Sequence, residues 1–168
     1  MRNLEAKFRL SDCAEVRRRA ETLGFVFCGK LVQRDTFFNV TEGKLKLRDE
    51  PGGALLIHYH RDHVEKLELS NYRIVPVAHA GPTREILGEA LGVLAEVRKE
   101  RLLLIRRNIR LHLDRVEALG EFGELEAVLD ENEAAEAYRA EVAEILGHLK
   151  IQETDLIRVS YYELARRA

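Results

Sequence analysis

The chain has 168 residues, with 27 Lys and Arg residues against 29 Asp and Glu residues and a formal net charge of −2. This length predicts a single globular domain over residues 1–168. The hydrophobic content of 46% excludes a disordered composition, and the small net charge argues against a general nucleic-acid or membrane-surface binder. Charged residues nevertheless make up 33% of the chain, which exceeds the roughly 25% of average soluble proteins. Any anion-binding site must therefore be local.

The cysteines and the N-terminal segment indicate a reducing compartment. Cys13 and Cys28 are too few for a disulfide framework and form no zinc-binding pattern. We expect both to be reduced, with Cys28 as a small buried residue. Residues 1–10 carry charges where a signal peptide needs an apolar core, and no stretch approaches ~18 apolar residues. The sequence thus predicts a cytoplasmic protein that does not partner a membrane.

The first half of the chain alternates between strand and turn signals. Residues 3–10 alternate polar and apolar side chains, which predicts a strand. A helix follows, with Ser11 as its N-cap and Gly24 just beyond its end. Strand-like sequence then runs from Phe25 to Phe38 with an interruption near Gly29. Turn signals at 41–43 and 51–53 separate two further strands, which predicts an antiparallel meander as far as Arg61.

The second half continues with strands and two helices. Pro82 opens a short helix that ends near Gly92, and Asn132 caps a helix over 133–149. The tail from Asp155 onward shows no clear pattern. The remaining predicted strands are Leu67–Val77, Val93–Ile105, Ile109–Glu117 and Phe122–Leu129.

Charged residues recur two positions apart on these strands, so each pair projects from one face of its strand. The pairs are Glu5 with Lys7, Lys46 with Arg48, Lys99 with Arg101, His112 with Asp114, and Glu124 with Glu126. For any one strand, the common interpretation is a half-buried sheet whose charges face water. Jointly the pairs are unusual, because the inner strands repeat cations and the terminal strands repeat carboxylates. This distribution favours charges that line the inside of a closed barrel.

We therefore predict an α+β fold in which an antiparallel closed β-barrel has its helices packed outside. Its lumen would hold Arg and Lys side chains together with a carboxylate cluster of Glu5, Glu124 and Glu126. Unpaired buried charge is costly, so such a cavity needs a polyanion. A divalent cation with oxygen ligands would join the carboxylates to that polyanion, and a triphosphate fits this description.

At these residues the sequence resembles the CYTH superfamily of triphosphate tunnel proteins, which includes class IV adenylyl cyclases and thiamine triphosphatases. The family's Glu-x-Glu-x-Lys motif corresponds to residues 3–7, where Asn3 replaces the first glutamate. The similarity extends over nearly the whole chain and is greatest for the class IV cyclase-like branch. The other matching segments, in the family's order, are 34–38, 43–48, 56–61, 70–72, 98–101, 109–117 and 122–126.

The resemblance implies roles for individual residues. Glu5, Glu124 and Glu126 would bind Mg²⁺ or Mn²⁺, and Asn3 would keep an oxygen ligand there while removing a negative charge. Lys7 and Asp114 would join the three glutamates as catalytic residues, with Asp114 near the metals or the reacting group. The cations along the triphosphate path would be Lys7, Lys46, Arg48, Arg61, Lys66, Lys99, Arg101 and Arg110.

Three functions remain open at this point. The first candidate is a metal-dependent adenylyl cyclase-like enzyme that converts ATP to cyclic AMP and pyrophosphate. The second is a hydrolase of thiamine triphosphate, a nucleoside triphosphate or tripolyphosphate. The third is a non-catalytic triphosphate-binding protein, because Asn3 weakens the metal site. A homodimer is one candidate oligomeric state, and the histidines at 58, 60 and 63 are expected to serve a surface or core role.

Overall fold

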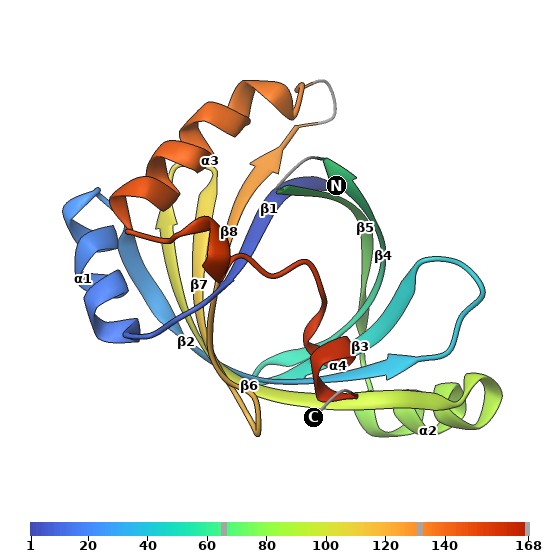
Figure 1. Ribbon diagram of the computed structural model, residues 1–168. Coiled ribbons are helices and arrows are strands. Elements are labelled where there is room, and N and C mark those ends of the chain that lie inside the picture. The colour runs from blue at the N-terminus through green and yellow to red at the C-terminus, as the bar shows by residue number, and fades with distance from the viewer. Residues whose placement is uncertain (65–66, 131–132, 167–168) are drawn as a thin grey trace.

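Eight antiparallel strands close into a barrel in the computed structural model, which describes residues 1–64, 67–130 and 133–166 (Figure 1). Around the barrel the strand order is β1-β5-β4-β3-β2-β6-β7-β8, and β8 pairs back to β1. The strands are β1 (Arg2–Arg9), β2 (Val26–Phe38), β3 (Lys44–Glu50), β4 (Gly53–Val64), β5 (Leu67–Val77), β6 (Val93–Arg106), β7 (Ile109–Val116) and β8 (Gly120–Leu129). The predicted closed barrel is thereby confirmed.

Strand alternation places polar side chains inside the barrel and apolar side chains outside. On β1, Leu4 and Phe8 belong to the large hydrophobic core, whereas Glu5 and Lys7 line an internal cavity. An apolar outer face must be covered. Helices α1 (Cys13–Thr22) and α3 (Glu136–His148) supply that cover.

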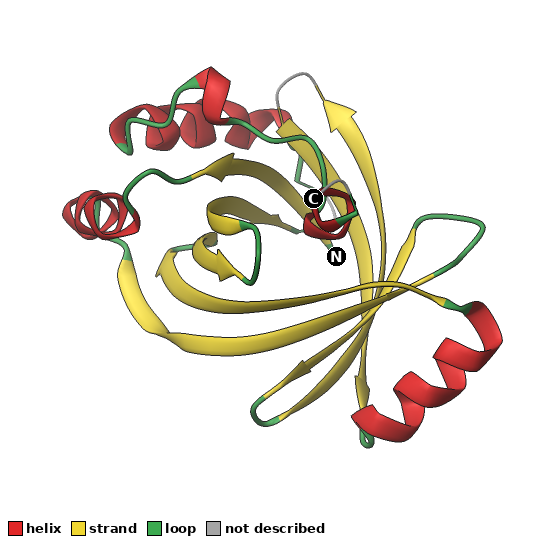
Figure 2. Ribbon diagram, turned by 60° about the horizontal axis from the view of Figure 1, so that its bottom comes forward, coloured by secondary structure: helices red, strands yellow, loops and turns green. Residues whose placement is uncertain are grey.

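The helices lie on different sides of the barrel (Figures 1 and 2). Helices α1 and α3 lie together on one side, where Val16 and Val142 are buried against the outer barrel face. Helix α2 (Ala80–Leu91) lies away from them and packs against Phe38 and Leu47. A 3₁₀ turn, η1 (Glu153–Asp155), precedes the short C-terminal helix α4 (Tyr161–Ala165).

A close contact between β1 and β8 fixes the strand that carries the carboxylates. Phe8 lies directly opposite Gly123, and a Cβ on Gly123 would stand 2.1 Å from the Phe8 ring. Only glycine leaves room for this ring on the outer face. Its neighbour Glu124 consequently points into the barrel, as does Glu126 two residues further on.

The helix caps and one cysteine differ from the sequence predictions or lie outside the described residues. Asp12, rather than Ser11, is the N-cap of α1, because its carboxylate accepts a hydrogen bond from the Glu15 backbone N–H at 2.9 Å. Cys28 is exposed rather than buried, because it lies where the β2/β6 register shifts between Phe27 and Gly29. Asn132, the predicted cap of the last long helix, lies outside the described residues, and α3 begins at 136.

Within the described ranges, no helix has the length and apolar character needed to cross a membrane.

Candidate active site

A cavity of about 430 Å³ lies inside the barrel, and all eight strands contribute side chains to it. This volume is within the range of small-molecule sites. Most of the residues predicted to bind metal or triphosphate line this single cavity. They are Asn3, Glu5, Lys7, Lys46, Arg48, Arg61, Lys99, Arg101, Arg110, Glu124 and Glu126.

One part of the cavity holds three cations around a single carboxylate, and we call these four residues the Asp35 cluster. Asp35 on β2 receives Lys46 at 3.1 Å, Arg48 at 2.7 Å and Lys99 at 2.9 Å. The cations reach it from β3 and β6, the two neighbours of β2 in the barrel. Asp35 is 2% exposed, so these ion pairs are shielded from water.

Burial and charge shift the pKa values within the Asp35 cluster. Burial tends to raise the pKa of Asp35, but Arg48 and the two lysines outweigh burial and hold the pKa well below its usual range. Burial, followed by the neighbouring Arg48, lowers the pKa of Lys46 to about 7. Burial also lowers the pKa of Lys99. The cluster therefore has more positive charge than its one carboxylate can satisfy.

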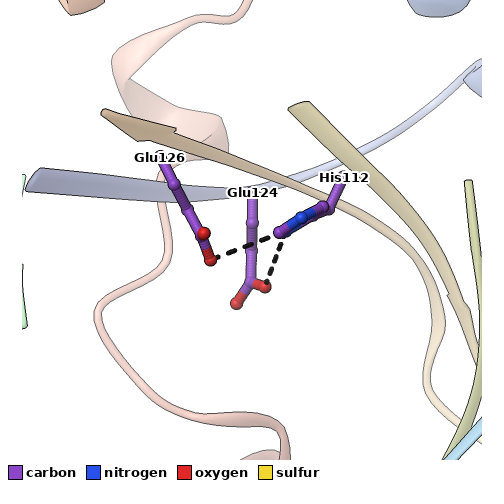
Figure 3. A group of neighbouring side chains, drawn as sticks. All are labelled: His112, Glu124 and Glu126. Carbon is purple, nitrogen blue, oxygen red and sulfur yellow. Dashed lines mark ion pairs between the residues drawn. The ribbon is translucent and has the colours of Figure 1, made fainter. Parts of the chain in front are cut away.

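A second part of the cavity holds His112, Glu124 and Glu126, which we call the acid cluster (Figure 3). One potential ligand atom from each residue lies within 4.8 Å of the others, and all three residues are buried. His112 Nδ1 lies 3.5 Å from Glu126 Oε1 and 3.9 Å from Glu124 Oε2. The pairing of β7 with β8 sets His112 directly opposite Glu124.

Cations from β1 and β6 hold Glu124 in place. Its two oxygens meet Lys7 Nζ at 2.7 Å and Arg101 at 2.5 Å. Arg101 also forms a two-pronged pair with Asp114 at 2.6 Å, and the Tyr161 hydroxyl donates to Asp114 at 2.9 Å. Burial favours the neutral form of Glu124, but Lys7 and Arg101 hold its pKa well below the usual value. Glu124 is therefore ionised.

The two candidate residues on β1 have partners of their own. The Asn3 amide nitrogen donates to Glu126 at 3.2 Å, and its oxygen accepts from the Tyr72 hydroxyl at 3.1 Å. Glu5 forms an ion pair with Arg61 at 2.7 Å. Burial raises the pKa of Glu5 to about 7 although Arg61 opposes that shift. Glu5 does not belong to the acid cluster as its interatomic distances define it, whereas Asn3 contacts that cluster through Glu126.

The remaining predicted residues occupy varied places. Arg110 lines the cavity and lies opposite Glu126 across the β7/β8 pair. Asp114 stands behind Arg101 and contacts it directly. Lys66 lies outside the described residues.

Sequence reasoning did not assign three residues that the structure brings into the site. Asp35 shares the inward face of β2 with Gln33 and Phe37, so strand alternation carried a signal for it. His112 shares a strand face with Asp114 in the sequence, but that spacing alone indicates no role for it. Tyr161 lies in the tail, where no periodic pattern points to it.

The acid cluster fits a divalent metal ion. Two carboxylates supply hard oxygen ligands, and His112 Nδ1 is a buried atom without a hydrogen-bond partner. Buried polar atoms of native proteins usually have partners. A bound cation would satisfy this nitrogen together with both carboxylates.

A second hollow, of about 600 Å³, has a different character. Its described lining includes His58, His60 and Arg73 but no carboxylate side chain. The two imidazole rings meet edge to face with their centroids 4.9 Å apart. Tyr72 lines both hollows, but the paired carboxylates and cations lie in the barrel cavity.

The protein is thus a closed antiparallel barrel with cations and a carboxylate cluster inside it, and proteins of known families share these features. The family model described as CYTH domain matches residues 1–161. A protein of Methanocaldococcus jannaschii, provisionally named an adenylate cyclase, is 30% identical over 98% of each chain. The chain therefore belongs to the CYTH family, as the motif series predicts.

Two solved structures share the fold. A protein of Pyrococcus horikoshii has a TM-score of 0.87 with 23% identity, over 96% of this chain and 98% of its own. A Hippeastrum protein has a TM-score of 0.68 with 16% identity, over 98% and 95% of the two chains. That protein is provisionally named an adenylyl cyclase and is described as having a dominant triphosphatase activity.

Proposed function

We propose that this protein is a divalent-metal-dependent enzyme that acts on an organic triphosphate, with adenylyl cyclase-like conversion of ATP to cyclic AMP as the first candidate. One observation carries the proposal: most cations and carboxylates inside the barrel cavity are already paired with one another. A free triphosphate, with about four negative charges near neutral pH, would upset this balance. A triphosphate that enters with divalent metal would largely preserve it, with Mg²⁺ or Mn²⁺ as the resident ion.

Both the Asp35 cluster and the acid cluster would exchange partners when the triphosphate and its metal bind. Phosphate oxygens would replace Asp35 as partners of Lys46, Arg48 and Lys99, and Arg and Lys are the usual ligands of phosphate. The metal, when bound, supplies a positive charge that polarises a phosphoryl oxygen and stabilises developing negative charge. Glu124 and Glu126 would hold it, with Glu5 facing them from β1. Lys7 and Asp114 would keep Glu124 and Arg101 in position.

The apolar residues that line the cavity support one orientation of the bound triphosphate substrate. Leu31 and Leu103 are half-buried, and the strand pairings set them opposite Arg101 and His112 respectively. A base or other organic group placed there would bring the α-phosphorus beside the acid cluster and the terminal phosphates toward the Asp35 cluster. In that orientation the ribose 3′ oxygen would form a bond to the α-phosphorus, the bond from the α-phosphorus to the bridging oxygen would break, and the hydroxyl proton would leave with pyrophosphate or to water.

A second candidate, hydrolysis, requires the reverse orientation. Its organic group would lie near Phe37, Ile57 and Tyr59, which brings the terminal phosphorus to the acid cluster. These residues line the same cavity and are more deeply buried than Leu31 and Leu103. The proposal places the organic group at the half-buried wall, and hydrolysis of thiamine triphosphate, ATP or tripolyphosphate remains the alternative.

Product analysis tests the proposal. The protein would be incubated with Mg²⁺ or Mn²⁺ and with ATP, thiamine triphosphate or tripolyphosphate, and products would be resolved by phosphorus NMR. Pyrophosphate with cyclic AMP identifies a cyclase, and orthophosphate identifies a hydrolase. Tight binding of a triphosphate without turnover of any of them would replace the enzyme with a non-catalytic binding protein.

A further inference from the structure

A buried glutamine on β2 lines the cavity but belongs to neither cluster. Gln33 is 4% exposed, and it shares the inward face of its strand with Leu31 and Asp35. Its amide nitrogen donates to Glu50 Oε2 at 2.6 Å. Among the described residues, its amide oxygen Oε1 has no hydrogen-bond donor. Buried polar atoms of native proteins usually have partners, so a bound molecule is the expected donor.

The partner of the amide nitrogen fixes the direction of the amide oxygen. A carboxylate only accepts hydrogen bonds, so the NH₂ end of Gln33 must face Glu50 and the oxygen must face away from it. Lys99 lies directly opposite Gln33 across the β2/β6 pair, but its ammonium is held by Asp35 at 2.9 Å. Gln33 Oε1 therefore remains available to a donor on a bound molecule.

The surroundings of Gln33 indicate what kind of group would donate. Leu31, Leu103 and Ile105 line the same cavity and are half-buried, which suits the apolar face of an aromatic ring. Glu50 lines the cavity as well and adds a second acceptor. An amino group offers two hydrogens, whereas a hydroxyl offers one and a keto oxygen offers none. An aromatic ring with an amino group therefore matches this part of the cavity.

We propose that Gln33 is a specificity-determining residue whose Oε1 accepts a hydrogen bond from a ring amino group, so that the protein selects triphosphates with amino-bearing rings over those with keto-bearing rings. A keto oxygen in that place would face two acceptors instead of a donor. Adenine and the aminopyrimidine of thiamine both carry the amino group. The proposal rests on the proposed function in that the organic group lies at the wall formed by Leu31 and Leu103.

Binding of matched ligands tests the proposal without turnover. The first ligand is an ATP analogue that lacks the 3′ hydroxyl and carries an imido group between the β- and γ-phosphorus, and its partner has hypoxanthine in place of adenine. Calorimetry with Mg²⁺ should show about tenfold or tighter binding of the adenine analogue by the wild type. Imido triphosphates of thiamine and of its keto counterpart oxythiamine form a second pair. The pair with the larger preference identifies the ring, and no preference in either pair would overturn the proposal.

Two substitutions ask whether the preference depends on Gln33. Gln33→Met should reduce it to about twofold or less, while tripolyphosphate, which has no ring, should bind within about twofold of its wild-type affinity. Glu50→Gln should also weaken the preference, because the new amide can donate to Gln33 Oε1. The control Asn71→Leu removes a side-chain amide that lines the second hollow, and it should keep the wild-type preference. An undiminished preference in Gln33→Met would contradict the proposal.

Turnover, measured separately with each unmodified triphosphate, keeps this proposal distinct from the proposed function. A preference that depends on Gln33 in a protein without turnover supports the ring subsite and sinks the proposed enzyme. Turnover of a triphosphate without such a preference does the reverse. Circular dichroism reports on the folding of each variant, and the wild-type comparison of the two ligand pairs stands even if a variant fails to fold.

Discussion

The Asp35 cluster and the acid cluster lie in one cavity but have opposite charge ratios. In the first, three cations share the carboxylate of Asp35. In the second, two carboxylates and an imidazole nitrogen converge, and Lys7 and Arg101 reach Glu124 from outside the group. The first is short of negative charge and the second is suited to a cation.

This difference shows how one tunnel can take a phosphate chain and a metal together. Without a bound triphosphate, the three cations of the first cluster share Asp35, and Lys7 and Arg101 pair with Glu124 of the second. Substitutions that remove one charge from either cluster should therefore have different effects on stability, turnover and binding.

Asp35→Asn should produce the largest change, because it leaves three buried cations without their carboxylate. Removing one partner from a buried ion pair costs about 3 to 5 kcal/mol. We expect a loss of this size in the free energy of unfolding, measured by urea titration, and partial recovery when tripolyphosphate is added. Asp49→Asn, at a residue 36% exposed in its side chain, should cost about 1 kcal/mol or less. Equal losses in both variants would contradict the shared-carboxylate arrangement.

Glu124→Gln should lower turnover about 100- to 1,000-fold, the scale of losing one fixed electrostatic contact to a transition state. The metal's advantage is greatest where charge develops, so the affinity for triphosphate should change less. Steady-state assays beside calorimetry separate the two effects. The control is Glu121→Gln on the same strand, where the side chain pairs with the exposed Arg115. A fall in affinity as large as the fall in turnover would mean that Glu124 serves binding.

Lys99→Met should weaken tripolyphosphate binding about ten- to a hundredfold, because a hydrogen bond to a charged group contributes roughly 1.5 to 3 kcal/mol. The matched control is Lys30→Met, which removes a lysine that pairs with Glu100 at half-exposed side chains. Isothermal calorimetry measures both variants. Wild-type affinity in Lys99→Met would show that phosphate does not reach the Asp35 cluster.

The affinity for tripolyphosphate should also depend on pH through Lys46, whose pKa is lowered to about 7 by burial. Between pH 7 and the ordinary lysine pKa of 10.5, Lys46 is protonated in the unfolded chain and neutral in the folded chain, so the free energy of unfolding rises with pH in this range. A bound polyanion favours the protonated form of Lys46, so the affinity for tripolyphosphate should fall by at most about tenfold for each pH unit above 7. Metal-free titrations at several pH values should show a flatter dependence for Lys46→Met. An unchanged slope in that variant would assign the dependence to another group.

Strand alternation predicted much of the barrel and its lining, because a period of two is a local property of the sequence. Glu5, Glu124 and Lys99 each share a strand face with a second charge, and all three line the cavity. The closure of the strands into a barrel was predicted from this pattern together with the family resemblance. Gly123 interrupts the alternation of side chains on β8, and the lack of a side chain there leaves room for Phe8 on the outer face of the barrel.

The partners within the cavity could not be predicted in the same way. Asp35 meets Lys46 and Lys99 only because β2 lies between β3 and β6, which no local pattern specifies. His112 faces Glu124 through the register of β7 with β8. Tyr161 reaches Asp114 from a tail without periodicity. These contacts depend on the order and register of the strands and on the path of the C-terminal segment, and not on local secondary-structure propensity.

The central claim is that the α-phosphorus lies beside a metal at the acid cluster while the terminal phosphates lie at the Asp35 cluster, and phosphorus relaxation by bound Mn²⁺ tests it most directly. The ligand would be a 3′-deoxy ATP analogue with an imido group between the β- and γ-phosphorus, which blocks both cyclisation and hydrolysis. Relaxation should be strongest at the α-phosphorus, beside the acid cluster, and weakest at the γ-phosphorus, beside the Asp35 cluster. Strongest relaxation at the γ-phosphorus would contradict the account.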